Sequence, residues 1–279
     1  VVDEPHERCV VRARGGDGGV VEVAADEGAV RFPPGPWRRL LEANRGASLS
    51  FEVYLRRDGE WCAMRPLVNE IAPEPIDATL AYRYMRPIYN NYWGMKLMQR
   101  SLSGFEERVL VDNSQFDHGC VNCHTFHKAS PERALVHVRT PMGPAMLLAD
   151  GGEPRKIDTR SRFNKGPGSY SSWHPGGGVI AFSSHKLKLM FHTVGPNRDV
   201  LDAASDMCLY HIDSGEVTSV KAIHRKDRME AWPQWGPQGE YLYYSSAPQL
   251  PLQRYREVRY DLMRVPYDAA SGVLGEPEV

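Results

Sequence analysis

The sequence predicts a mainly β protein with an N-terminal β-sandwich-like module, a short helical segment and a series of β-propeller-type blades. Its 25 glycines and 21 prolines indicate many turns. Short alternating strands fill the first part of the chain, and a long internal repeat fills the last part. We therefore expect three regions, at residues 1–75, 76–130 and 131–279.

The N-terminal region contains hairpin and strand signals. Residues 10–14 and 20–23 are apolar runs around a glycine-rich turn, which is typical of a β-hairpin. Residues 37–44 predict one or two helical turns ending near Gly46. Residues 49–55 then alternate apolar and polar side chains, as a half-buried strand does. This pattern predicts a small β-sandwich-like module.

Residues 77–103 have a different period. Apolar side chains recur every three or four residues, as on one face of an amphipathic helix, at Leu80, Tyr84, Ile88, Tyr92, Met95, Met98 and Leu102. Because Pro87 interrupts helical hydrogen bonding, we expect two helices, near 77–86 and 88–103. We expect the apolar face of these helices either to pack in the core or to form one wall around a cofactor.

The C-terminal region repeats itself. Residues 172–184 align with residues 234–246, and each begins with a W-x-P-x-G turn before an apolar strand. Such units are typical of propeller blades, which usually recur every ~40–50 residues. Trp173 and Trp235 are 62 residues apart, and the excess lies in an insertion at 185–205. A blade around 136–139 and 145–148 precedes them.

Two or three blades do not close a ring, which takes about four to eight. Three explanations stay open: the chain is a fragment, its sheets end in another arrangement, or a partner completes the ring.

Cys120, Cys123 and His124 form a C-x-x-C-H motif at 120–124. Two thiols at this spacing can each form a thioether to a haem vinyl group, and the adjacent histidine can ligate the iron. A thioredoxin-like C-x-x-C is disfavoured because no βαβ pattern surrounds it. Half of a zinc site is the other alternative, with His118, His127 or His137 recruited. The motif predicts one covalent haem c.

The sixth iron ligand is sought among the remaining histidines and methionines. His192 is favoured as the distal ligand because it lies on the insertion, which can cover a haem. His137 and Met190 are the alternatives, and Met142 is a further one. His174 lies in a turn and is interpreted as a local cap.

Composition excludes some classes of function. Lys+Arg number 34 and Asp+Glu number 35, a formal net charge of -1, so no nucleic-acid-binding surface is indicated. No apolar run is long enough for a transmembrane segment. Haem c is matured outside the cytoplasm, so we expect a periplasmic or extracellular protein whose export signal is absent from this sequence.

Three cysteines lie outside the motif: Cys9, Cys62 and Cys208. Either Cys9 and Cys62 form a disulfide, or all three are independent thiols.

The chain resembles a family of exported c-type cytochromes in which a CVNCH haem motif precedes TolB-like propeller repeats. The resemblance rests on residues 37–41, 81–84, 99–100, 120–126, 173–175 and 205–206. It also includes a Phe-His pair, here Phe191 and His192. Members of that family continue into further blades. The resemblance implies an exported location and a haem cofactor, but it does not imply a particular reaction.

These observations predict an exported monohaem c-type cytochrome that carries electrons between redox partners, which include other cytochromes or further copies of itself. One alternative is a haem-dependent oxidoreductase or peroxidase. Another is a propeller binding or assembly module with a structural haem. Ser183 and Ser184 beside His185 suggest a nucleophile and a base, but no glycine elbow or placed acid accompanies them, which disfavours hydrolysis.

Overall fold

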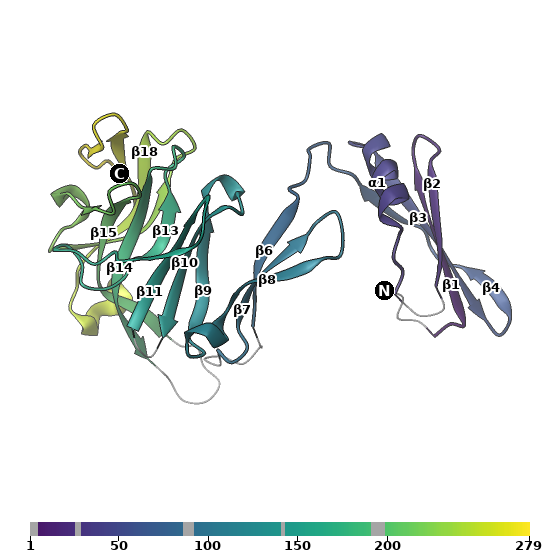
Figure 1. The fold of residues 1–279 in the computed structure, drawn as a ribbon, viewed down its shortest axis with the longest axis horizontal. Helices are drawn as coiled ribbons and strands as arrows, with labels where there is room; N and C mark the ends of the chain where they lie inside the picture. Colours follow the sequence, from purple (N-terminus) through teal and green to yellow (C-terminus); the bar gives the residue numbers. More distant parts are fainter. Residues whose placement is uncertain (1–4, 26–28, 86–91, 141–142, 191–198) are drawn as a thin grey trace. The chain divides into compact units, whose positions relative to one another are not determined.

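The computed structural model describes residues 5–25, 29–85, 92–140, 143–190 and 199–279. The prediction of a mainly β protein built from several small sheets is confirmed (Figure 1). Two compact units divide the chain: Val1–Leu80 with Gln99–Arg108, and Ala81–Met98 with Val109–Val279. Among the described residues, no helix is both long and apolar enough to cross a membrane.

The first unit is built on one five-stranded antiparallel sheet covered by a helix. The strand order is β2-β1-β3-β4, with β5 also paired to β3. Helix α1 packs Leu40 against Ala13, Val21 and Leu49 of the sheet, so the second layer of this module is a helix. The elements are β1 (Arg8–Gly15), β2 (Val20–Ala25), α1 (Pro34–Ala43), β3 (Ser48–Arg57), β4 (Glu60–Ala63) and β5 (Leu67–Glu70).

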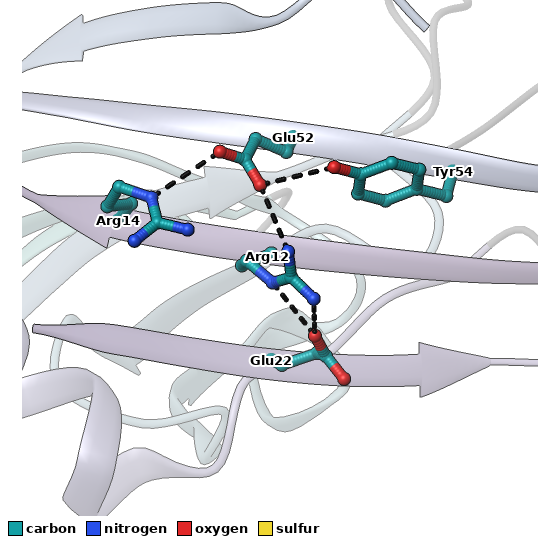
Figure 2. Close-up of polar contacts among 5 residues, drawn as sticks. All are labelled: Arg12, Arg14, Glu22, Glu52 and Tyr54. Atoms are coloured by element: carbon teal, nitrogen blue, oxygen red, sulfur yellow. Dashed lines mark hydrogen bonds and ion pairs between the residues drawn. The ribbon is translucent and has the colours of Figure 1, made fainter. Parts of the chain in front are cut away.

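The outward face of this sheet carries paired charges. Because side chains alternate along a strand, Val11 and Ala13 are buried whereas Arg12 points outward. Arg12 lies opposite Glu22 on one neighbouring strand and Glu52 on the other. It donates to Glu22 at 2.6 Å and to Glu52 at 3.4 Å (Figure 2). Such exposed cross-strand pairs contribute about 0.2–1 kcal/mol each.

Cys9 and Cys62 are free thiols in this structure. Each lies directly opposite Leu55, one on the strand to either side of β3. Two strand spacings separate them by about 10 Å, whereas a disulfide requires Cα atoms within about 7 Å. The register of the sheet therefore keeps these two cysteines apart.

The prediction of two helices in residues 77–103 is wrong. The segment forms strands, β6 (Thr79–Tyr84) and β7 (Lys96–Ser101), which join β8 (Glu107–Asp112) in a three-stranded sheet. Residues 86–91, with Pro87, lie outside the described residues. The error has a physical cause: positions four apart share one face in a strand as well as in a helix. Leu97 and Gln99 are buried between less buried neighbours, which is strand alternation.

Three successive four-stranded antiparallel sheets form most of the second unit (Figure 1). Their strands run in chain order, as in propeller blades. The first contains β9 (Cys120–Phe126), β10 (Arg133–Thr140), β11 (Gly143–Asp150) and β12 (Arg155–Ile157). The second contains β13 (Ser169–Trp173), β14 (Val179–Met190), β15 (Asp199–His211) and β16 (Val217–Thr218). The third contains β17 (Arg228–Trp235), β18 (Tyr241–Pro248), β19 (Asp261–Asp268) and β20 (Val273–Leu274).

Apolar cores join these sheets in pairs. One core joins the first and second sheets around Met146, Trp173 and Phe182. Another joins the second and third sheets around Met207 and Trp235. The sheets therefore pack face to face in sequence order, as the repeat predicts.

The predicted insertion lengthens the hairpin of the second blade. The β14–β15 ladder runs from the pair Val179 and His211 to the pair Met190 and Asp199. Residues 191–198 lie outside the described residues.

Candidate functional site

The motif at 120–124 lies on strand β9, an edge strand of the first blade, rather than in a helical segment. Cys123 lies directly opposite His137 on β10, and Cys120 lies opposite Arg139. The cysteines are three positions apart, which in a regular strand points them to opposite faces. A register shift between His137 and Arg139 interrupts the ladder between the two cysteines. Cys123 lines a cavity with His137, whereas Cys120 packs in the core with Val136 and Val138.

Arg139 is the cation of this site. Its Nη2 donates to Cys120 Sγ at 3.3 Å, and Cys120 is only 2% exposed. Burial raises the pKa of the Cys123 thiol, and the positive charge of Arg139 partly opposes that shift. Burial therefore favours the protonated form of the Cys123 thiol.

A small cavity of about 150 Å³ adjoins the motif. It lies between the first two blades and is lined by Cys123, His124, Thr125, Leu135, His137, Met146, Ser169, Tyr170 and Ser171. Among the described residues, the buried Nε2 atom of His137 has no hydrogen-bond partner. Burial, and next the charge of Arg139, lower the pKa of His137 to about 4. His137 is therefore neutral at pH 7 and can act as a metal ligand.

His124 also borders this cavity but belongs to the other side of the strand. It pairs with Val136, its ring contacts Phe126 at 5.6 Å, and its Nδ1 lies 3.0 Å from the carbonyl oxygen of Asn122. Because neighbouring residues of a strand face opposite sides, the imidazole that shares a face with Cys123 is that of His137.

The other predicted ligands are placed as follows. His192 and Met142 lie outside the described residues, and Met190 is described only as the last residue of β14. His174 is a local cap, as predicted, because its Nδ1 accepts the Gly176 N–H at 2.9 Å. His127 holds the same turn through the Pro175 carbonyl oxygen at 2.9 Å. No group of three or more His, Cys, Asp or Glu side chains with metal-site geometry occurs among the described residues.

The motif supplies the donor types of a covalent haem, but the cavity beside it does not fit one. Cys123, His124 and His137 line the hollow, and Cys120 does not. Cavities that enclose cofactors measure about 300–1,000 Å³, which exceeds the 150 Å³ of this hollow. A larger cavity of about 470 Å³ lies in the first unit, but no cysteine or histidine lines it.

A buried hydrogen-bond chain occupies the second blade. Ser183 Oγ lies 2.6 Å from His185 Nε2, and His185 Nδ1 lies 2.9 Å from Asp202. The sequence argument missed Asp202, which reaches His185 through the β14–β15 hairpin and carries no local signal. Along this hydrogen-bond chain, serine, histidine and acid follow one another as they do in a catalytic triad. Ser183 is 0% exposed, however, so its oxygen meets no substrate, and the chain holds strands together.

Comparisons with known proteins identify no family for this chain. No family model and no curated protein matches it. An oligogalacturonate lyase in complex with manganese is 12% identical, with 81% of this chain and 61% of that chain covered and a TM-score of 0.41. A second oligogalacturonate lyase, from Vibrio parahaemolyticus, is 9% identical, with coverage of 83% and 61% and a TM-score of 0.40.

A protein from Lactobacillus plantarum is 10% identical over 98% of this chain and 95% of its own, with a TM-score of 0.33. This chain spans 61% of the length of each lyase. At such TM-scores these likenesses say nothing about the reaction, and the functional argument rests on the residues of the site.

Proposed function

We propose that this chain is an exported monohaem c-type cytochrome that carries electrons between redox partner proteins. The observation that carries the proposal is the C-x-x-C-H spacing of Cys120, Cys123 and His124. Cys123 and His124 border one cavity together with a second imidazole, that of His137.

Each motif residue has a chemical role in this proposal. Cys120 and Cys123 would hold the haem through two thioether bonds. His124 and His137 are the two imidazoles available to the iron. When bound, the haem supplies a one-electron ferric/ferrous couple.

One feature favours electron transfer over peroxidase chemistry. A peroxidase keeps one iron position open, whereas here the imidazoles of His124 and His137 border the same cavity. His137 also lies directly opposite Cys123.

A pyridine haemochrome spectrum of the full chain, produced in a host that attaches haem c during export, tests the proposal. We expect one covalent haem per polypeptide in the wild type and none in Cys120→Ser/Cys123→Ser. Cys62→Ser is the matched control because this thiol is exposed on the first unit, and it should retain the haem. A wild-type protein without covalent haem overturns the proposal.

A further inference from the structure

Three side chains that carry sulfur or nitrogen donors form a row across the first blade. Cys123 on β9 lies directly opposite His137 on β10, and His137 lies directly opposite Met146 on β11. Residues paired in this way point to the same face of the sheet, with Cβ atoms about 4.5–5.5 Å apart. All three side chains line the cavity of about 150 Å³. The strand register therefore places a thiol, an imidazole and a thioether at one cavity.

The row is buried, and its imidazole has no polar partner. Met146 is 1% exposed and His137 is 7% exposed. Among the residues that the structure describes, no group hydrogen-bonds to His137 Nε2. A buried polar atom without a partner costs free energy, and a bound ligand would offset that cost. The imidazole is thus placed to bind a ligand that enters this cavity.

The cavity has the size for an ion. Its volume of about 150 Å³ is below the range of about 300–1,000 Å³ for cavities that hold larger ligands. Metal–ligand bonds are only about 2.0–2.3 Å long. Cys123 and Met146 stand two strand spacings, or roughly 10 Å, apart, with the imidazole between them. A methionine side chain has three rotatable bonds with which its sulfur can reach towards that imidazole.

The donor types select the metal. Thiolate and thioether sulfurs are soft ligands that favour Cu(I), and imidazole also binds copper. Zinc takes four ligands from Cys, His, Asp and Glu side chains. In the part of the chain that the structure describes, no three such side chains have metal-site geometry. His124 borders the cavity from the other side of β9 and does not belong to the row. Cu(I) bound to one thiolate is neutral overall, which suits a buried site.

We propose that the haem-free chain binds one Cu(I) ion through Cys123, His137 and Met146. The Cys123 thiol loses its proton as its sulfur binds the ion, and the copper remains Cu(I), so no electron is transferred. This inference does not rest on the proposed function. A Cys123 that has formed a thioether with haem has no thiolate to offer, so haem and copper are alternative partners of this sulfur.

A Cu(I) titration of the full chain tests the site, with protein produced in the cytoplasm without haem and copper kept reduced by ascorbate under nitrogen. In competition with the chelator bicinchoninate, we expect one Cu(I) per wild-type chain and none in Cys123→Ser. Met146→Leu conserves volume and so keeps the fold, yet it should weaken binding by about ten-fold, or roughly 1.4 kcal/mol. Met207→Leu is the matched control, because Met207 is equally buried and does not line the cavity.

Copper X-ray absorption of the wild type gives a readout that does not depend on how variants fold. We expect two sulfur donors and one nitrogen donor at the ion. Cys120→Ser separates this site from one built on the two motif cysteines. Because Cys120 packs with Val136 and Val138 and does not line the cavity, this variant should keep its copper. Cys62→Ser should also keep it, since this exposed thiol lies on the first unit.

The outcomes separate the copper site from the proposed function. Loss of copper in Cys120→Ser, or undiminished binding in Met146→Leu, overturns the copper site. A chain that attaches haem but binds no Cu(I) in its haem-free form overturns only the copper site. A chain that binds Cu(I) but attaches no haem overturns only the proposed function.

Discussion

His137 lies directly opposite Cys123 in the antiparallel ladder between β9 and β10. Residues paired in this way point to the same face of a sheet, so the imidazole and the thiol share one side. For the haem that we propose, His137 is therefore the distal candidate among the described residues.

His137→Ala should therefore change the spin state of the haem-loaded protein. Loss of the second imidazole leaves an open iron position, and we expect a low-spin spectrum to become high-spin. Visible absorption and binding of cyanide measure this change. His211→Ala is the control, because His211 bonds Thr218 away from the cavity. A low-spin spectrum that persists in His137→Ala and disappears in His192→Ala would assign the distal role to His192 instead.

Asp202→Ala should destabilise the fold, because Asp202 has a structural role and no hydrolytic one. The change leaves the buried Nδ1–H of His185 without its acceptor, which costs about 1–3 kcal/mol. Urea unfolding followed by far-UV circular dichroism measures the loss. Asp213→Ala, at an exposed position, should change the unfolding free energy by less than about 0.5 kcal/mol. Esterase activity that depends on Ser183 would contradict the structural role of this chain.

Glu230 should make stability depend on pH. Burial, the largest cause, raises its pKa to about 7, and the charge of Asp206 contributes in the same direction. A carboxyl whose pKa is higher in the folded protein stabilises it below the unfolded pKa, and that contribution is lost as pH rises towards 7.

The unfolding free energy should therefore fall between about pH 4.5 and pH 7, by about 1–3 kcal/mol from this group. Glu230→Gln should flatten that part of the profile, whereas exposed Glu276→Gln should leave it unchanged. Parallel profiles for wild type and Glu230→Gln would show that Glu230 does not titrate in this range.

Gly239→Ala should destabilise the turn of the third blade. Gly239 has φ +80°, and a Cβ there would meet the imidazole of His174 in the second blade. We expect a loss of roughly 1–3 kcal/mol in thermal or urea unfolding. Gly178→Ala is the matched control, because no atom lies within 4 Å of its added Cβ. Equal stability of the two variants would contradict the close approach of these turns.

The sequence by itself determined those features that local patterns encode. The glycine-rich hairpin, the short helix and the two tryptophan turns are all present where their residues predict them. These elements depend on turn chemistry and strand alternation within a few residues, which a single sequence displays. The spacing of Cys120, Cys123 and His124 likewise predicts haem attachment from the sequence alone.

Only the tertiary structure decided which residues meet. Apolar positions four apart in residues 77–103 suit a helix and a strand equally, and pairing with β8 selected the strand. The ladder between β9 and β10 brought Cys123 to His137, and the hairpin brought Asp202 to His185. Strand register sets these contacts between residues distant in the chain, and no local period in the sequence specifies register.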